Sequence, residues 1–119
     1  MTNTLDTTIF RVLGSDEWAT ALATGKYDGA AHDKADGFIH FSTRDTLAAT
    51  LALHYGKRTG LRLLHVTVAS VRDKLKWEPA RGGNLFPHLY DVLSVEHVTR
   101  VDELPLDDNG VHILPEDLR

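Results

Sequence analysis

The chain has 119 residues, no cysteine, and 17 acidic against 13 basic residues, giving a formal net charge of −4 at pH 7. The length suits one compact domain. We expect it over residues 8–115, with flexible termini at 1–7 and 116–119. The absence of cysteine excludes disulfides, thiolate metal ligands and a cysteine nucleophile. The negative charge disfavours bulk nucleic acid as a partner, because a phosphate backbone requires a basic surface.

The beginning of the chain indicates neither export nor membrane insertion. Most of the first eight residues are polar, so no basic start leads into an apolar run of the kind found in signal peptides. Hydrophobic residues make up 42% of the chain and charged residues 25%, which is typical of a folded globular protein. We therefore expect a cytoplasmic protein without membrane contact, and its oligomeric state is left open.

The first elements in chain order are a strand and a short helix. Alternating apolar side chains predict a strand over 8–14. An amphipathic helix follows over 15–24, with Ser15 as its cap and Gly25 as its end. The next stretch is rich in Asp, Ala and Gly and predicts a loop.

A second strand and helix follow this loop. Alternation over 38–42 predicts a strand. The spacing of apolar residues after it predicts a helix capped by Ser42 or Thr43 and ended by Gly56 or Gly60. Asp45 lies three residues after Ser42 and would complete a variant of the capping box.

The second half of the chain is mostly strand. Alternation predicts a strand over 61–68, a helical turn and then an extended segment over 75–78, and two or three further strands before residue 115. Pro87 within this part favours an edge or irregular position. Two main helices early in the chain, followed by a run of strands, predict an α+β fold.

His40 and Ser42 form the first candidate site. They share one face of the strand over 38–42, beside the N-terminus of the following helix, whose free N–H groups favour an anion. Each also has an ordinary structural explanation. His40 would be a packed histidine bonded to a carbonyl, and Ser42 would be a helix cap.

The segment around Arg81, Gly82 and Gly83 forms the second candidate site. Glycines allow a backbone to approach a ligand closely, and a guanidinium can bind a phosphate or carboxylate with two parallel hydrogen bonds. Glu78 precedes this segment by three residues. The alternative is a glycine turn beside a solvated arginine.

Phe86, His88 and Tyr90 alternate along the next predicted strand and therefore share one face. This face is unusually polar and aromatic for a plain core. It strengthens the candidate site formed by the preceding segment.

The sequence lacks the motifs of several other kinds of functional site. The seven histidines form no H-x-x-x-H or HExxH motif, so we predict no metal site. The sequence also lacks the G-x-S-x-G elbow of serine hydrolases, the Walker A motif and the glycine fingerprint of dinucleotide-binding domains.

The segments "ADGFIHFST", "LKWEPARGG" and "LFPHLY", with the opening "IFRVL" and the closing "VHILP", resemble a small bacterial and fungal family known as domain of unknown function 952. The likeness spans about residues 9–115. The resemblance implies a fold grouped with the ADP-ribosyltransferase superfamily, in which split, bent antiparallel or mixed β-sheets surround a cleft for a nicotinamide dinucleotide.

The resemblance also implies site residues. In one branch of that superfamily a basic residue lies on the first strand and an aromatic-Ser-Thr motif ends the second, which Arg11 and the segment 41–43 match. The branch takes its catalytic glutamate from E-x-E or Q-x-E, and neither occurs in this chain. Glu78 is favoured over Glu96 for this role, because Arg81 and the two glycines lie beside it.

Three hypotheses follow. The first is an ADP-ribosyltransferase-like enzyme that uses NAD or a related ribosyl-phosphate ligand; the second is a non-catalytic module for a small anion or nucleotide; the third is a structural domain without a ligand. Under the first hypothesis each side chain has a role. Arg11 and Arg81 would bind phosphate, Ser42 and Thr43 would support the nicotinamide side, and His40 and His88 would form hydrogen bonds to ribose. Tyr90 would stack on a planar ring, Glu78 would act on the ribose, and Gly82 and Gly83 would allow close approach of the backbone.

Overall fold

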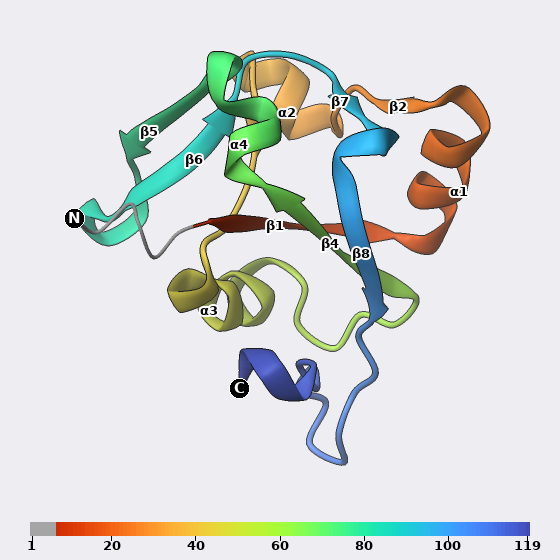
Figure 1. The fold of residues 1–119 in the computed structure, drawn as a ribbon. Coiled ribbons are helices and arrows are strands. Elements are labelled where there is room, and N and C mark those ends of the chain that lie inside the picture. Colours follow the sequence, from red (N-terminus) through yellow and green to blue (C-terminus); the bar gives the residue numbers. More distant parts are fainter. Residues whose placement is uncertain (1–6) are drawn as a thin grey trace.

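The computed structural model describes residues 7–119. Three strands, β1 (Thr8–Gly14), β4 (Leu61–Thr67) and β8 (Val98–Glu103), form a central antiparallel sheet in the order β1-β4-β8. In Figure 1 this sheet crosses the middle of the molecule, with β5 and β6 on one side and α1 and β2 on the other.

A second antiparallel sheet has the order β3-β6-β5 and consists of β3 (Ile39–His40), β6 (Leu85–Leu89) and β5 (Leu75–Pro79). Pro87 lies in its central strand, β6. A two-stranded ribbon pairs β2 (Lys26–Tyr27) with β7 (Leu93–Ser94). The expected split, antiparallel arrangement of the sheets is therefore present.

Four α-helices accompany the sheets within the described part of the chain. They are α1 (Ser15–Thr24), α2 (Ala31–Asp36), α3 (Arg44–His54) and the single turn α4 (Val68–Val71). Short 3-10 turns cover Arg72–Lys74 (η2), Arg81–Gly83 (η3), Val95–His97 (η4) and Glu116–Leu118 (η5). No helix within residues 7–119 combines the length and apolar character needed to cross a membrane.

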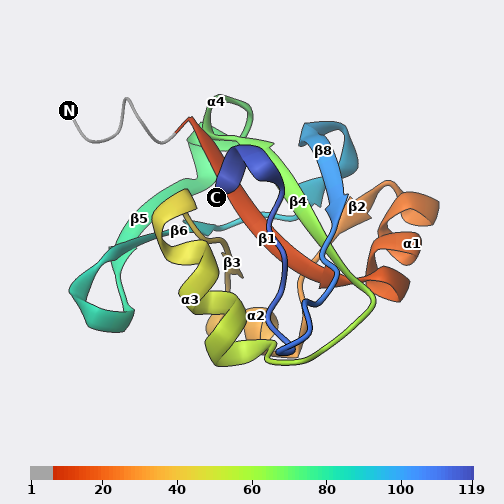
Figure 2. The ribbon, with the colours of Figure 1, turned by 90° about the horizontal axis from the view of Figure 1, so that it is seen from below.

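Strands β1 and β4 of the central sheet are buried on both faces because each is a nearly continuous run of apolar residues. Ile9 and Leu13 of β1 join one core cluster, together with residues of α1, β6 and β7. Phe10 and Val12 join the other cluster, which α3 and the C-terminal segment cover. Figure 2 shows α3 and the C-terminal turn over the same region of β1.

One short bridge joins the two larger sheets. The N–H of Phe10 donates to the carbonyl of Ser42 at 2.8 Å, and the N–H of Ser42 donates to the carbonyl of Phe10 at 2.7 Å. This antiparallel bridge fixes the start of α3 against β1. It therefore sets where the helix meets the β3-β6-β5 sheet.

The predicted order of strands and main helices agrees with the structure, and the differences are local. Residues 31–36 form α2 instead of part of a loop, since the Asp33 carboxylate accepts from the N–H of Ala30 at 2.6 Å and secures the start of the helix. The predicted strand over 38–42 is reduced to β3. Glu116–Leu118 form η5, where Asp117 pairs with Arg100; the expected domain bounds stay a prediction. The expectation for residues 1–6 lies outside the described residues.

Helix ends also differ from their predicted residues. Gly14, not Ser15, precedes the first turn of α1, and its N–H donates to the Glu17 side chain at 3.0 Å. Thr43 caps α3, because its hydroxyl accepts from the N–H of Thr46. Thr46 also completes the capping box that was predicted for Asp45. The helix ends at His54, with Tyr55 as its C-cap, before either of the predicted glycines.

Candidate functional site

One face of the β3-β6-β5 sheet carries polar and aromatic side chains. His40 is directly opposite His88 in the strand register, and Lys76 faces His88 from the other side. The ring of Phe38 stacks on that of His88, with centroids 4.1 Å apart, and His40 meets His88 edge to face at 5.5 Å. The predicted polar-aromatic face is therefore present.

A carboxylate fixes the imidazole of His88. Nδ1 of His88 lies 2.7 Å from Oε1 of Glu78, and the hydroxyl of Tyr90 donates to the same oxygen at 2.7 Å. These hydrogen bonds, that of His88 first, hold the pKa of Glu78 below its ordinary value. The bond to Glu78 raises the pKa of Tyr90.

Asp33 is the centre of a second, buried network. Its Oδ1 accepts from Nη1 of Arg11 at 2.7 Å and from the backbone N–H of His40 at 3.0 Å. Arg11 also donates to the hydroxyl of Tyr27 and to the carbonyl of His40. Burial opposes ionisation of Asp33, but the bonds from His40 and Arg11 outweigh it and hold its pKa well below the usual range.

Both ring nitrogens of His40 face carboxylates. Nδ1 lies 2.8 Å from Oδ1 of Asp33, and Nε2 lies 2.9 Å from Oδ2 of Asp36. Because a carboxylate only accepts hydrogen bonds, this geometry favours the doubly protonated ring. The hydrogen bond to Asp33 is the main reason that the pKa of His40 is raised.

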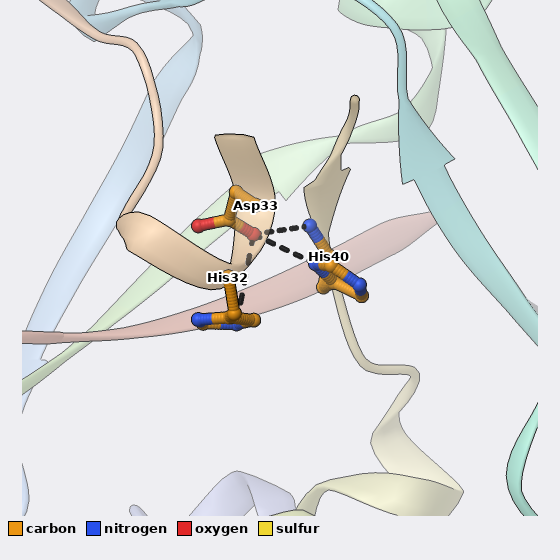
Figure 3. Close-up of side chains that lie close together, drawn as sticks. All are labelled: His32, Asp33 and His40. Carbon is orange, nitrogen blue, oxygen red and sulfur yellow. Dashed lines mark hydrogen bonds and ion pairs between the residues drawn. The ribbon is translucent and has the colours of Figure 1, made fainter. Parts of the chain in front are cut away.

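His32, Asp33 and His40 lie close enough to resemble a metal site. Figure 3 shows both imidazoles next to the same oxygen of the Asp33 carboxylate, and one ligand atom of each residue lies within 4.8 Å of the others. Oδ1 of Asp33 already accepts from the guanidinium of Arg11, whose positive charge repels a cation. We therefore assign this cluster to an ion-pair network, and the predicted absence of a metal stays a prediction.

A pocket of about 530 Å³ opens between the β3-β6-β5 sheet, β1 and α3. Its lining includes three arginines and four histidines, and none of its lining residues, all within the described 7–119, is an aspartate or glutamate. Aromatic rings and the hydroxyls of Ser42, Thr50 and Tyr55 complete the wall. The charged and imidazole side chains that line the pocket are those of Arg11, Arg58, Arg81, His32, His40, His54 and His88.

Arg81 connects the β5–β6 hairpin to α3 across the pocket. Its Nη2 donates to the hydroxyl of Thr50 at 3.1 Å, and the hydroxyl of Ser42 donates to the same oxygen at 3.1 Å. The guanidinium also lies over the ring of Phe86, 5.1 Å from its centroid. The pocket wall is thus a chain of polar groups backed by an aromatic ring.

The structure brings five of the predicted site residues to this pocket, namely Arg11, His40, Ser42, Arg81 and His88. The side chain of Arg11 is buried against Asp33 and is already bonded, so a phosphate would have to compete with that ion pair. Both nitrogens of His40 are likewise bonded, so a hydrogen bond from Nε2 to a ribose requires Asp36 to release it.

The other five predicted residues do not line the pocket. Thr43 is buried as the cap of α3. Glu78 and Tyr90 adjoin the pocket through His88. Gly82 and Gly83 have φ of 68° and 79°, so they form the left-handed turn that carries Arg81.

Sequence reasoning did not assign several residues in and around the pocket on α2 and α3, and it left open whether His54 and Tyr55 belong to the site. Thr50 and His54 of α3 line the pocket, and Tyr55 and Arg58 continue this wall. Thr50 and His54 are four residues apart, so helical spacing alone places them on one face. Asp33 was missed because the segment that contains it reads as a loop.

Together the fold and pocket define a small α+β domain built on split antiparallel sheets, with a histidine- and arginine-lined pocket. A family model described as "Protein of unknown function (DUF952)" matches residues 12–101. The chain belongs to this family, and the predicted membership is confirmed. No curated protein matches the sequence.

Solved structures of protein CC0527 from Caulobacter crescentus are similar to this chain. The crystal structure shares 43% sequence identity, covers 94% of this chain and 98% of its own, and has a TM-score of 0.90. The solution NMR structure of the same protein shares 44% identity over 88% of this chain and 90% of its own, with a TM-score of 0.81. These matches support the mixed α+β architecture described above.

Proposed function

We propose that the pocket binds NAD or a related ribosyl-phosphate ligand. The observation that carries this proposal is the composition of its lining, which has three arginines and four histidines and no acidic residue among the described residues. In a chain of net charge −4, the guanidinium groups of this lining favour an anion at this position. The volume of about 530 Å³ is in the range of small-molecule sites.

Two guanidinium groups are available for phosphates. Within residues 7–119, neither Arg58 nor Arg81 has a carboxylate oxygen within 4.0 Å, whereas Arg11 is paired with Asp33. A guanidinium without an acidic partner can bind a phosphate through two parallel hydrogen bonds. Arg58 and Arg81, rather than Arg11, therefore become the proposed phosphate ligands.

The remaining walls suit a ribose and a planar ring. The hydroxyls of Ser42 and Thr50 can bond to sugar oxygens, and Tyr55 and Phe86 offer aromatic surface. These hydroxyls and aromatic rings favour a nucleotide-like ligand over inorganic phosphate, because phosphate would make no contact with the aromatic rings. They also suit the NAD ligand that the sequence resemblance implies.

Titration calorimetry with NAD, ADP-ribose and inorganic phosphate tests this proposal. We expect NAD and ADP-ribose to bind more tightly than phosphate. Arg81→Gln and Arg58→Gln should each weaken binding by about ten- to hundredfold, the usual cost of a lost charge-assisted hydrogen bond. Arg72→Gln is the matched control, because Arg72 lies in η2 outside the pocket.

Thermal unfolding gives an independent measurement. A ligand at a hundredfold excess over its Kd should stabilise the protein by about 2.7 kcal/mol and raise its Tm. If millimolar NAD, ADP-ribose and nucleoside monophosphates produce no heat of binding and no Tm shift, the proposal is contradicted. The hypothesis of a structural domain without a ligand then remains.

A non-catalytic module for the same ligands is the second candidate. Glu78, the residue expected to act on the ribose, does not line the pocket and instead bonds to His88 and Tyr90. Under this candidate, NAD binds and is recovered unchanged. Chromatography of the ligand after incubation distinguishes the two.

A further inference from the structure

The backbone of Arg58 is held on both sides. Its N–H donates to the carbonyl of Tyr55 at 3.0 Å, and its carbonyl oxygen lies 2.7 Å from Nε2 of His112. A carbonyl only accepts hydrogen bonds, so Nε2 of His112 carries the hydrogen. His112 is only 9% exposed, whereas Arg58 is an exposed residue of the pocket lining. A buried histidine near the C-terminus thus sets the position of a pocket arginine.

His112 belongs to a compact hairpin over residues 105–113, which we call the C-terminal hairpin. An antiparallel bridge closes the hairpin at His112, and the carboxylate of Asp107 accepts from two backbone N–H groups of its turn. Leu104 and Leu114, on either side of the hairpin, pack in the core cluster that α3 covers. The hairpin is therefore fixed both internally and to the core.

The hairpin also contacts the residue before Arg58. Lys57 has a φ of 64°, in the left-handed region that residues with a Cβ rarely adopt. Such a backbone persists only where its surroundings hold it. The hairpin is so close that a Cβ added at Gly110 would lie 3.1 Å from Cγ of Lys57. In Figure 2 the C-terminal segment runs beside the loop between α3 and β4, which contains Lys57 and Arg58.

An aromatic ring fixes the guanidinium of Arg58. The guanidinium lies over Tyr55, 5.3 Å from the ring centroid, and the hydroxyl of Tyr55 donates to the carbonyl of Val12 at 3.4 Å. Strand β1 therefore holds the ring, and the C-terminal hairpin holds the backbone. Ordering a side chain on binding costs affinity, so an arginine that is already ordered binds an anion more tightly than a mobile one.

We propose that His112 is a positioning residue for anion binding at Arg58, and that the C-terminal hairpin thereby determines how tightly the pocket binds phosphate groups. This inference rests on the proposed function. His112 is not among the residues that line the pocket, so it acts through the backbone of Arg58. The ligand class is a molecule that carries a phosphate or pyrophosphate group, because its oxygens match two parallel guanidinium donors.

Calorimetric titration of the full chain with ADP-ribose is the direct test. His112→Leu keeps a side chain of similar volume but removes the donor to Arg58. The Kd should therefore rise by about three- to tenfold, the usual effect of one lost hydrogen bond. His112→Gln retains an N–H near the position of Nε2 and should recover most of this loss. Asp117→Asn is the control, because it alters the C-terminal turn outside the hairpin and should leave the Kd unchanged.

A double-mutant cycle separates positioning from a general loss of stability. In the Arg58→Gln background, His112→Leu has no guanidinium to displace, so it should change the Kd by less than about twofold. A merely structural role for His112 would give the same loss in both backgrounds.

Gly110→Ala disturbs the hairpin without changing His112, and it keeps the test open if His112→Leu does not fold. Gly110 has a φ of 79°, and its added Cβ would press on Lys57, so the Kd should rise. Gly25 has a similar φ of 86°, with open space at that position, and lies outside the pocket. Gly25→Ala therefore introduces comparable backbone strain and should leave the Kd unchanged.

Nitrogen-15 relaxation of the Nε–Hε group of Arg58 measures its order without a ligand, and we expect greater motion in His112→Leu than in the wild type. A Kd within twofold of wild type in His112→Leu, equal losses in the two backgrounds, no recovery by His112→Gln or unchanged motion of Arg58 overturns this inference and leaves the proposed function standing. If ADP-ribose does not bind to the wild-type chain, both are overturned.

Discussion

Arg11 and Asp33 form a buried ion pair that joins β1 to α2. Nη1 and Oδ1 are 2.7 Å apart, and the two side chains are only 5% and 1% exposed. The same carboxylate oxygen accepts from the backbone and ring of His40. Asp33 thus holds together three segments that are separate in the sequence.

Asp33→Asn should strongly destabilise the protein. It leaves the guanidinium of Arg11 buried without a counter-charge, and breaking a buried pair in this way costs about 3–5 kcal/mol. Urea unfolding measures the change. Asp28→Asn is the control, because Asp28 forms an exposed pair with Lys34 and should change the free energy of unfolding by less than about 1 kcal/mol. Equal losses for both variants would contradict the central role of Asp33.

Stability should decrease as pH rises through the titration of His40. Its pKa is raised in the folded protein, mainly by the hydrogen bond to Asp33. Its contribution is therefore fully present below the unfolded value of about 6.5 and is lost as pH rises through the folded value. Asp33, whose pKa is lowered, remains charged over this range and adds no slope.

The difference between wild type and His40→Asn isolates this effect. His32 has a pKa lowered by burial and contributes a slope of opposite sign, but it is present in both proteins. We expect the stability advantage of the wild type to be larger at pH 5 than at pH 9, as measured by urea unfolding. A constant advantage across this range would show that His40 is not held as a cation.

Gly29→Ala should disturb the same network through the backbone. Gly29 has a φ of 104°, and an added Cβ would lie 2.8 Å from Cβ of Asp33. Gly37 has a similar φ of 88° but open space at that position, so Gly37→Ala should cost only the backbone strain of about 1–2 kcal/mol. Chemical unfolding should show a clearly greater loss for Gly29→Ala. Similar losses would mean that Asp33 tolerates displacement.

Asp117→Asn should release the C-terminal turn. Two nitrogens of Arg100 donate to the Asp117 carboxylate at 2.8 and 2.9 Å, and this lowers the pKa of Asp117 to about 2. Amide hydrogen exchange of residues 116–119 should become faster in the variant at neutral pH. In the wild type the pair should persist until pH falls through about 2. Glu116→Gln, which changes the neighbouring carboxylate, is the control and should leave exchange unaltered.

Periodic patterns were sufficient to predict most of the main elements. The apolar runs over 8–14 and 61–67 arise because β1 and β4 are buried on both faces by different clusters. A period of two placed Phe86, His88 and Tyr90 on one face. Helix α2 was missed because its start depends on the buried carboxylate of Asp33, not on an apolar stripe.

The site was less predictable because it depends on long-range contacts. No local pattern shows that Arg11 has Asp33 as its partner, so Arg11 was predicted to bind a ligand. Likewise, the contribution of Thr50 and Arg58 depends on α3 being placed beside the β3-β6-β5 sheet. Glu78 was predicted to act on the ribose, and its contact with His88 depends on the register of β5 and β6, which no local pattern gives.

The reciprocal hydrogen bonds between Phe10 and Ser42 also determine which part of the pocket can rearrange. They anchor the rear wall to β1, so a molecule entering there meets a rigid surface on that side. On the opposite rim, Arg81 reaches α3 through one bond to a hydroxyl at the end of a glycine turn. Adaptation to an incoming molecule must therefore come from the tip of the β5–β6 hairpin. The pocket thus has one rigid side, at β1, and one adjustable side, at Arg81.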